Sequence, residues 1–477
     1  MKKQYKAEGS ISIYLALTFT IMLSLILVII EGAREEAVRL KAECAVDLSL
    51  HSIFAEYNRE LLEQYDLFFI DTSYGLDHAS IHRTEEHLKA YLDDNFTVEQ
   101  TAGILKDLLG MYTEEVSVTD YSLASDEMGL LIKRQAVSYM KDLFGLTYVT
   151  ELNRQLETVE KEGFLTRDVT AERISNQKAL DSIEIPPRQV GEDEWEEVEL
   201  NNPADAVNAS RGILAFVIDP EDGLSSAAIN PAHYISARTP NKGSGLVGRE
   251  GLGSGDELVF NEYLIQKYGR YTQPKEEGAL QYQLEYILEG KSSDIENLKA
   301  VVNKLLLLRE TANVIYLFSD PAKMAEAEAL AIALTAEIPV PGIEQLVKIS
   351  LIFAWAYAES VYDVRTLLKG GSIPLLKDKE SWHYSLSGML SFGEDEEMGA
   401  ENTTGIHYEG YLRLFLALEN TEQKTMRAMD VIEMDIRKCP GNGFFQLDNC
   451  VDYIEAEIHT ASSYGFSHEI TRSFYYY

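Results

Sequence analysis

Residues able to carry out acid–base, nucleophilic or metal chemistry are scattered along this chain. His78, His82 and His87 fall within one expected helix, but no HExxH pattern accompanies them, so exposed polar positions are the simpler interpretation. No GxSxG elbow is present to hold a serine nucleophile. Asp and Glu residues could still converge in the fold for acid–base work. We therefore expect a protein that is not an enzyme, with no metal site; the alternative is a hydrolase acting on cell wall or protein.

A glycine-rich segment formally contains the GxGxxG pattern, at Gly243, Gly245 and Gly248. A dinucleotide site needs a strand before this pattern and a helix that opens on it. Here Pro240 and Asn241 precede the pattern and more glycines follow it, which predicts a flexible loop. No phosphate-binding GxxxxGK[ST] loop occurs either. We expect no cofactor.

Cysteine is scarce, with three residues in the whole chain. Cys439 and Cys450 bracket a Pro-Gly-Asn-Gly turn, so a short-loop disulfide is possible if the domain faces an oxidising space. The alternative is two small hydrophobic residues in adjacent strands. Three thiols cannot form a disulfide framework.

The chain has 477 residues and a formal net charge of −36. This length fits two or three packed units. A surface this acidic repels the phosphates of nucleic acid, which bind clustered Lys and Arg. The acidic runs at 192–197 and 394–397 are typical of solvated surface or linker. We therefore expect no nucleic-acid partner.

Residues 11–30 contain no charged side chain, and at ~1.5 Å per residue their helix matches a hydrocarbon core of ~30 Å. A cleaved secretory signal has an apolar stretch of only about 7–15 residues. The segment therefore predicts a retained transmembrane helix whose first partner is the lipid bilayer. Three lysines precede it and three cations follow it soon after, so charge alone does not orient it. We expect residues 1–10 to be a cytoplasmic tail and the bulk of the chain to be extracytoplasmic.

Small residues recur every fourth position in this span, at Ser12, Ala16, Thr20 and Ser24. Residues four apart share a helix face, and small residues let two membrane helices approach closely. This transmembrane packing face predicts contact with another membrane protein or with a second copy. The alternative is that the hydroxyls bond carbonyl groups of their own helix.

No Pro or Gly interrupts residues 33–74, and apolar residues there follow a helical period. The membrane helix is therefore expected to continue unbroken to about Leu62, as a stalk over residues 31–63. A rod that lies half in lipid and half against a soluble domain is typical of a pilin-like helix.

The N-terminal pattern resembles the TadE/TadG-like pseudopilins of Tad (Flp) pilus systems. In those proteins a Gly precedes an apolar span that closes with Glu-x-x-Arg, and the matching residues here are Gly9, Glu31 and Arg34. Type IV pilins carry a Glu five residues after the Gly, where this chain has Tyr14. The resemblance therefore does not extend to prepilin processing after Gly9 or to a main filament subunit.

Three further stretches, 51–71, 284–320 and 351–377, resemble a domain-of-unknown-function family found near Tad-type clusters in Gram-positive bacteria. The resemblance implies partners among pilin-like or Tad assembly membrane proteins. It implies an accessory role in a pilus or secretion system and no activity. A sensor or adaptor is a third possibility.

The rest of the chain predicts an α+β, mostly helical fold with a small antiparallel sheet formed partly by the C-terminal strands. We expect a first soluble α+β region over 64–182, whose last part, 151–182, is one charged amphipathic helix. An acidic linker and the glycine-rich loop follow over 183–256. A helical domain over 257–477 ends in two strands joined through Gly465. Its apolar run 349–358 is about half the length of a membrane span and predicts a buried helix.

Overall fold

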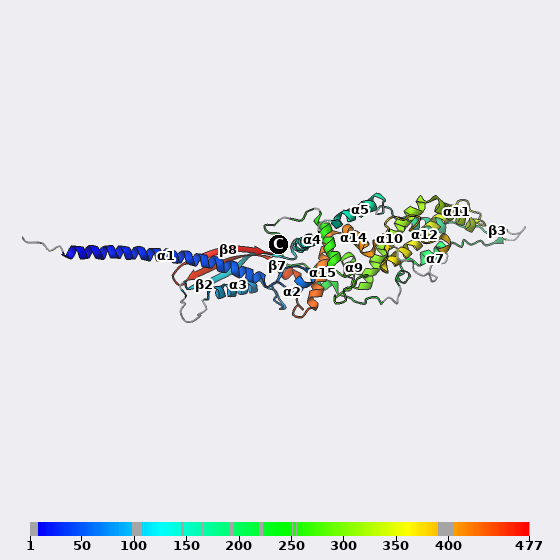
Figure 1. The fold of residues 1–477 in the computed structure, drawn as a ribbon. Coiled ribbons are helices and arrows are strands. Elements are labelled where there is room, and N and C mark those ends of the chain that lie inside the picture. The colour runs from blue at the N-terminus through cyan, green and yellow to red at the C-terminus, as the bar shows by residue number, and fades with distance from the viewer. Residues whose placement is uncertain are drawn as a thin grey trace, which may run out of the picture. The chain divides into compact units, whose positions relative to one another are not determined.

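The computed structural model describes residues 8–97, 107, 109–144, 147–164, 166–189, 195–218, 223–249, 251–253, 255–389 and 405–476 (Figure 1). The fold is α+β and mostly helical, as predicted. The chain forms two compact units that alternate along the sequence. Unit 1 comprises Met1–Gln135, Pro240–Gly251 and Cys439–Tyr477, and unit 2 comprises Ala136–Thr239 and Leu252–Lys438. This interleaved division differs from the consecutive ranges expected from the sequence.

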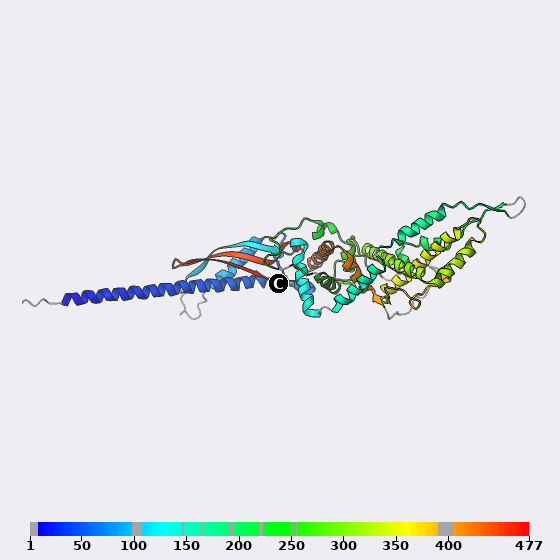
Figure 2. The ribbon, with the colours of Figure 1, turned by 90° about the horizontal axis from the view of Figure 1, so that it is seen from above.

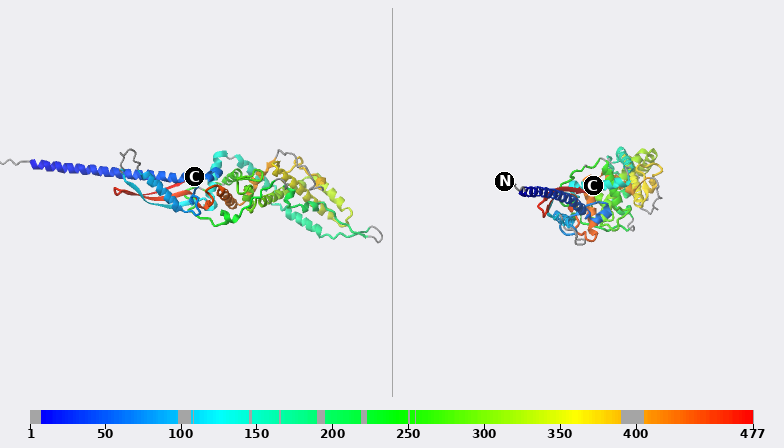
Figure 3. Two further views of the ribbon diagram at one scale, coloured as in Figure 1. Left: turned by 90° about the horizontal axis from the view of Figure 1, so that it is seen from below. Right: turned by 60° about the vertical axis from the view of Figure 1, so that its left-hand side comes forward.

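Unit 1 is built on the long helix α1 (Glu8–Phe54). From Val38 onward one face of α1 is buried, because it packs against helix α3 (Ile81–Phe96) and strand β8 (Ser467–Tyr475). Figures 2 and 3 show this half of α1 running beside the strands. The apolar face includes Ala42, Val46 and Leu50, spaced three to four residues apart as helical packing requires.

Helix α1 does not continue to Leu62, so that prediction is wrong. It ends at Phe54, and a separate helix α2 (Arg59–Tyr65) follows. Asn58 separates them because its side chain accepts a hydrogen bond from the Leu61 N–H at 3.1 Å and so caps α2. The Asn58 N–H donates to the Phe69 carbonyl at 2.9 Å, which holds the chain in the turn.

The sheet of unit 1 is antiparallel and has β7 (Cys450–Ser462) at its centre. Strand β2 (Met111–Leu123) pairs along one edge of β7, and β8 and the two-residue β1 (Ile70–Asp71) pair with β7 as well. The predicted C-terminal strands are confirmed, with Gly465 at φ +89° in the connecting turn. Alternate β7 residues, including Ile454 and Ile458, face α1 in the core.

The glycine-rich segment is a loop, as predicted. The Asp126 carboxylate organises it by accepting hydrogen bonds from the Gly243 and Gly245 N–H groups at 2.8 and 3.1 Å. A Cβ added to Gly243 would lie 2.6 Å from the Tyr121 carbonyl oxygen. The glycine is therefore needed for close packing against β2, and the next helix, α8, begins only at Asp256, too far from the pattern to receive a phosphate there.

Unit 2 is helical, and its central helix α12 packs against α6, α7, α10 and α11. The predicted apolar segment 349–358 lies in α12, and its residues 350–358 are buried, as expected. The helices are α4 (Leu130–Phe144, which begins in unit 1), α5 (Thr147–Lys161), α6 (Val169–Asp181), α7 (Ala204–Ala209), α8 (Asp256–Lys267), α9 (Gln283–Glu289), α10 (Asp294–Ser319), α11 (Pro321–Thr335), α12 (Ile343–Leu368), α13 (Leu386–Met389), α14 (Tyr408–Leu418) and α15 (Thr421–Lys438). Two short strand pairs join them, β3 (Arg188–Gln189) with β4 (Trp195–Glu196) and β5 (Ser372–Ile373) with β6 (Ile406–His407).

The single amphipathic helix expected over 151–182 is wrong, because this region forms the two helices α5 and α6. Gly163 lies between them at φ +74°, a left-handed conformation that ends a helix. Asp168 then starts α6 by accepting a hydrogen bond from the Ala171 N–H at 2.8 Å.

Candidate functional site

The N-terminal half of α1 is the most distinctive feature of the surface. Among the described residues, one helix is long and apolar enough to cross a membrane, the part of α1 over Ile11–Phe54. Its most apolar stretch is wholly exposed, so it is not the core helix of a soluble unit. A secretory signal near the N-terminus meets the same length and composition test. A row of exposed large apolar side chains needs an apolar environment, and lipid supplies one.

The small residues Ser12, Ala16, Thr20 and Ser24 all lie on the exposed surface of α1. The Thr20 hydroxyl donates to the Ala16 carbonyl at 2.8 Å, and the Ser24 hydroxyl donates to the Ile21 carbonyl at 2.8 Å. These hydroxyls therefore bond their own helix, as the alternative interpretation anticipated, and they are satisfied for an apolar medium. Their role as a packing face stays a prediction.

The family-like motif residues lie along α1, with Gly9 in its first turn. Glu31 and Arg34 form an exposed ion pair at 3.5 Å, which contributes little by itself. The Arg34 guanidinium also lies 3.9 Å from the centre of the Tyr464 ring, in the turn between β7 and β8. Arg34 therefore fastens the sheet to α1 just beyond the apolar span.

Cys439 and Cys450 do not form the disulfide considered from the sequence, and both are thiols. The Cys439 sulfur accepts a hydrogen bond from Gln64 at 3.3 Å, at the end of α15 and not in a strand. Cys450 is buried at the start of β7 and donates to the Gln446 carbonyl at 3.4 Å. Each of the two cysteine side chains therefore makes a hydrogen bond with a different neighbour.

The three histidines near α3 do not converge on one point. The Nδ1 atom of each ring lies within 3.0 Å of a different carboxylate: His78 with Asp77, His82 with Glu85, and His87 with Glu56. Separate ion pairs of this kind do not build a shared ligand set.

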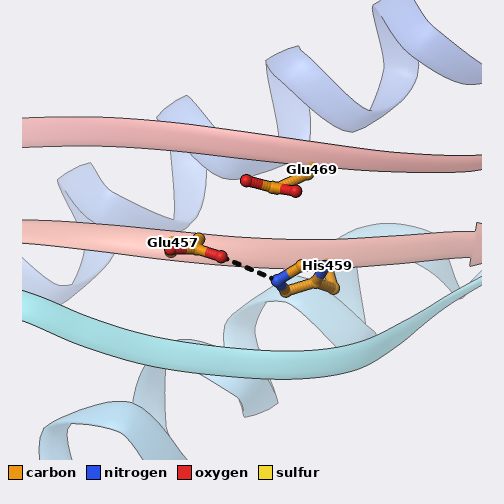
Figure 4. A group of neighbouring side chains, drawn as sticks. All are labelled: Glu457, His459 and Glu469. Atoms are coloured by element: carbon orange, nitrogen blue, oxygen red, sulfur yellow. Dashed lines mark hydrogen bonds and ion pairs between the residues drawn. The ribbon is translucent and has the colours of Figure 1, made fainter.

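The sheet brings together a different set of donors, Glu457, His459 and Glu469, on its open face (Figure 4). One ligand atom from each lies within 4.8 Å of the others. Sequence inspection missed this group because Glu469 lies opposite His459 only through the β7–β8 register. An imidazole and two carboxylates are zinc ligand types. All three are at least partly exposed, and Glu457 already pairs with His459 at 3.0 Å, so we assign the group no role.

The interior of unit 2 holds a charged network of Lys377, Arg309, Glu359 and Asp363, all fully buried. Lys377 lies 2.6 Å from Glu359 and 2.7 Å from Asp363, and Arg309 lies 3.0 Å from Asp363. Burial acts to raise the pKa of Glu359, but hydrogen bonds from His383 and Lys377 outweigh it and lower the pKa. The two cationic and two anionic side chains neutralise one another, and such pairing offsets the cost of burying charged groups in the protein interior.

Two fully buried carboxyl groups of unit 2 have raised pKa values, a property common in catalytic acids. Burial raises the pKa of Glu285 to about 7 and that of Asp430 to about 6. Both side chains are fully buried. Glu285 accepts a hydrogen bond from Tyr408, and Asp430 accepts one from Tyr286, at 2.6 and 2.8 Å. Neither carboxyl group reaches a pocket described below, so neither can meet a substrate there.

Each unit has a pocket on its described surface. The pocket in unit 1 has a volume of about 210 Å³ and a polar lining that includes Lys242. The pocket in unit 2 has a volume of about 560 Å³ and contains the carboxylates of Asp168 and Glu419. Asp168 caps α6 and Glu419 lies 3.7 Å from Lys304, so both have structural partners.

Sequence inspection also passed over two Ser-x-x-Lys pairs on helices, a spacing used by some serine hydrolases. They are Ser138 with Lys141 on α4 and Ser175 with Lys178 on α6. Lys141 pairs with Asp256 at 2.5 Å, and neither pair lines the two pockets. A lysine held by a carboxylate is a poor general base for the nearby serine.

Residues 193–462 match the family described as Family of unknown function (DUF5702). The chain belongs to this family. The match covers more than half of the 477 residues, including most of unit 2 and all of β7, whereas α1 lies outside it. No curated protein and no solved structure matches the chain. Membership of DUF5702 therefore assigns no activity, and the N-terminal resemblance to pseudopilins stays a prediction.

Proposed function

We propose that this DUF5702 protein is a non-enzymatic, membrane-anchored envelope protein, a pseudopilin-like accessory component of a Tad (Flp)-type pilus or secretion system. The observation that carries the proposal is the continuity of α1. Its first half is apolar and exposed on every side, and its second half packs against the sheet of unit 1 without a break in the helix. A helix of this kind couples a folded domain rigidly to the bilayer.

In this proposal α1 crosses the membrane once, with its N-terminus in the cytoplasm and the chain beyond the span outside. The Ser12–Ala16–Thr20–Ser24 face packs against a helix of another pilin-like or Tad assembly protein, because small side chains allow close approach. The Arg34–Tyr464 contact lies just beyond the span and transmits the position of α1 to the sheet. The buried and paired carboxylates of unit 2 support a structural over a hydrolytic role.

Two threonines on opposite faces of α1 supply a matched test. Thr20 lies on the small-residue face and Thr18 lies on the opposite side, and both hydroxyls bond carbonyl groups of their own helix. In cells deleted for the gene, we expect the wild-type chain and Thr18→Phe to restore surface pili or secretion. Thr20→Phe should restore neither, although the same amount of chain is in the membrane. The proposal is wrong if deletion of the gene leaves both pili and secretion intact.

A further inference from the structure

Helix α1 carries a second apolar face beyond the membrane, opposite the one that packs on the sheet. The packed face includes Val38 and Ala42, which are fully buried. The opposite face includes Ala37, Leu40 and Cys44, which are exposed, and 63% of Leu40 is accessible. Among the described residues, the sheet and α3 cover one apolar side of α1, and the other side is left for a second partner.

The exposed face follows the 3–4 spacing of a coiled-coil seam, in which apolar residues alternate at intervals of three and four. The seam begins inside the span and continues into the stalk. Its members, all exposed, are Leu23, Ile26, Ile30, Ala33, Ala37, Leu40 and Cys44. The next seam position is Asp47, which pairs with Arg472 of β8 at 3.3 Å, so the seam ends after Cys44.

Lipid cannot cover the outer part of this seam. Leu40 and Cys44 lie ten and fourteen residues beyond Ile30, the last residue of the apolar span. At ~1.5 Å per residue they are about 15 and 21 Å past the hydrocarbon edge. The headgroup layer is only about 5–8 Å thick on each side. The covering surface must therefore be protein.

The charges beside the seam identify which protein fits. Glu36 and Lys41 flank the seam on opposite sides and are five residues apart. In a parallel, in-register helix pair, flanking residues five apart on the two chains face each other and form ion pairs. Glu36 of one copy would thus meet Lys41 of another, twice by symmetry. The Glu36 side chain is 68% exposed and pairs with Arg39 at 2.9 Å. Lys41 is partly exposed and its ammonium donates to the Phe96 carbonyl at 3.2 Å, so each side chain would exchange a contact within its own chain for the pair between copies.

We propose that a second copy of this chain covers the seam, so that two α1 helices pack parallel and in register from Leu23 to Cys44. The small side chains of Ala33, Ala37 and Cys44 allow close approach, and Leu40 supplies a larger contact. This inference rests on the proposed function only in that α1 stays in the membrane, which makes the two helices parallel. The seam faces away from Val38 and Ala42, so the dimer leaves the sheet packing undisturbed.

A native cysteine supplies the test. In such a dimer the two Cys44 thiols meet across the symmetry axis, and Cys44 is exposed. We expect mild copper-catalysed oxidation of the full chain in its own membrane to yield a disulfide-linked homodimer that Cys44→Ser abolishes. In the Cys44→Ser background, Leu40→Cys should restore the dimer. Arg39→Cys should not, since Arg39 is 57% exposed but lies off the seam.

The charge pair supplies a second, independent variant. With Cys44 in place, Glu36→Lys should lower the yield of cross-linked dimer about five-fold, and Glu36→Lys with Lys41→Glu should restore it. The inference is overturned if neither Cys44 nor Leu40→Cys yields a cross-linked dimer. It is also overturned if Arg39→Cys gives an equal yield, or if the chain cross-links only to another protein.

These outcomes are separate from the test of the proposed function. A chain that supports pili and stays in the membrane without cross-linking to itself contradicts the dimer alone. A chain that cross-links through Cys44 while gene deletion leaves pili and secretion intact contradicts the pilus role alone.

Discussion

The buried Glu285 carboxyl group in unit 2 makes the stability of that unit depend on pH. One of its oxygens accepts hydrogen bonds from Tyr408 and from the Tyr271 N–H, at 2.6 and 2.9 Å. The other oxygen, Oε2, has no hydrogen-bond partner among the described residues. Burial therefore raises the pKa from 4.5 to about 7. At ~1.4 kcal/mol per pKa unit, this rise corresponds to roughly 3 kcal/mol of folding free energy.

The sign follows from proton binding. Between pH 4.5 and about 7 the folded state keeps the Glu285 proton that the unfolded state has lost. The free energy of unfolding therefore falls as the pH rises through this window. Glu285→Gln has no proton to lose, so its free energy of unfolding should lack this fall. At pH 8 the variant should be more stable than the wild type by up to ~3 kcal/mol, and at pH 4 the two should agree within ~1 kcal/mol.

Urea unfolding of the detergent-solubilised full chain, followed by tryptophan fluorescence, measures this difference. The three tryptophans, Trp195, Trp355 and Trp382, all belong to unit 2, so the signal reports that unit. The expected gain at pH 8 moves the urea midpoint upward by ~1 M. Asp430 titrates in both proteins and cancels from the comparison. Parallel curves for wild type and Glu285→Gln from pH 4 to pH 8 would refute the reasoning.

Three further predictions concern the remaining sites. Lys377→Met should destabilise unit 2 by about 3–5 kcal/mol, because it leaves Glu359 without its buried cation; tryptophan fluorescence in urea measures this, and an unchanged midpoint contradicts it. Alkylation of the unfolded chain without reductant should add three labels by intact mass, since Cys439 and Cys450 are thiols; a single label would indicate a disulfide. Gly243→Ala should speed hydrogen exchange in β2 and β7 by crowding the Tyr121 carbonyl, whereas the control Gly251→Ala, which has open space, should not; equal exchange in both variants contradicts the packing argument.

Much of the fold could be predicted from local patterns. The apolar span, the helices of unit 2 and the C-terminal strands follow from periodicity and from glycine and proline positions, as with Gly465 between β7 and β8. The predicted helix boundaries were wrong where a single side chain or glycine interrupts a helix. Asn58 ends the α1 rod by capping α2, and Gly163 divides the helix expected over 151–182.

The candidate sites were harder to predict, because they depend on contacts between distant residues. The cluster of Glu457, His459 and Glu469 exists only through the register of two strands. Glu285 has a raised pKa because the fold buries it, and its hydrogen-bond partner Tyr408 lies 123 residues later in the chain. The helical period of the stalk does not say which face of the helix packs, and only the structure reveals that the sheet leaves Leu40 and Cys44 exposed.

The central claim is that α1 stays intact as a membrane anchor, and one experiment on the mature protein tests it. Membranes are washed with carbonate at high pH, and the chain in each fraction is analysed by intact mass. We expect the chain in the membrane pellet, with residues 11–30 present. Recovery in the soluble fraction, with every residue before Glu31 missing, would show that the apolar half of α1 is a removed signal and would contradict the account.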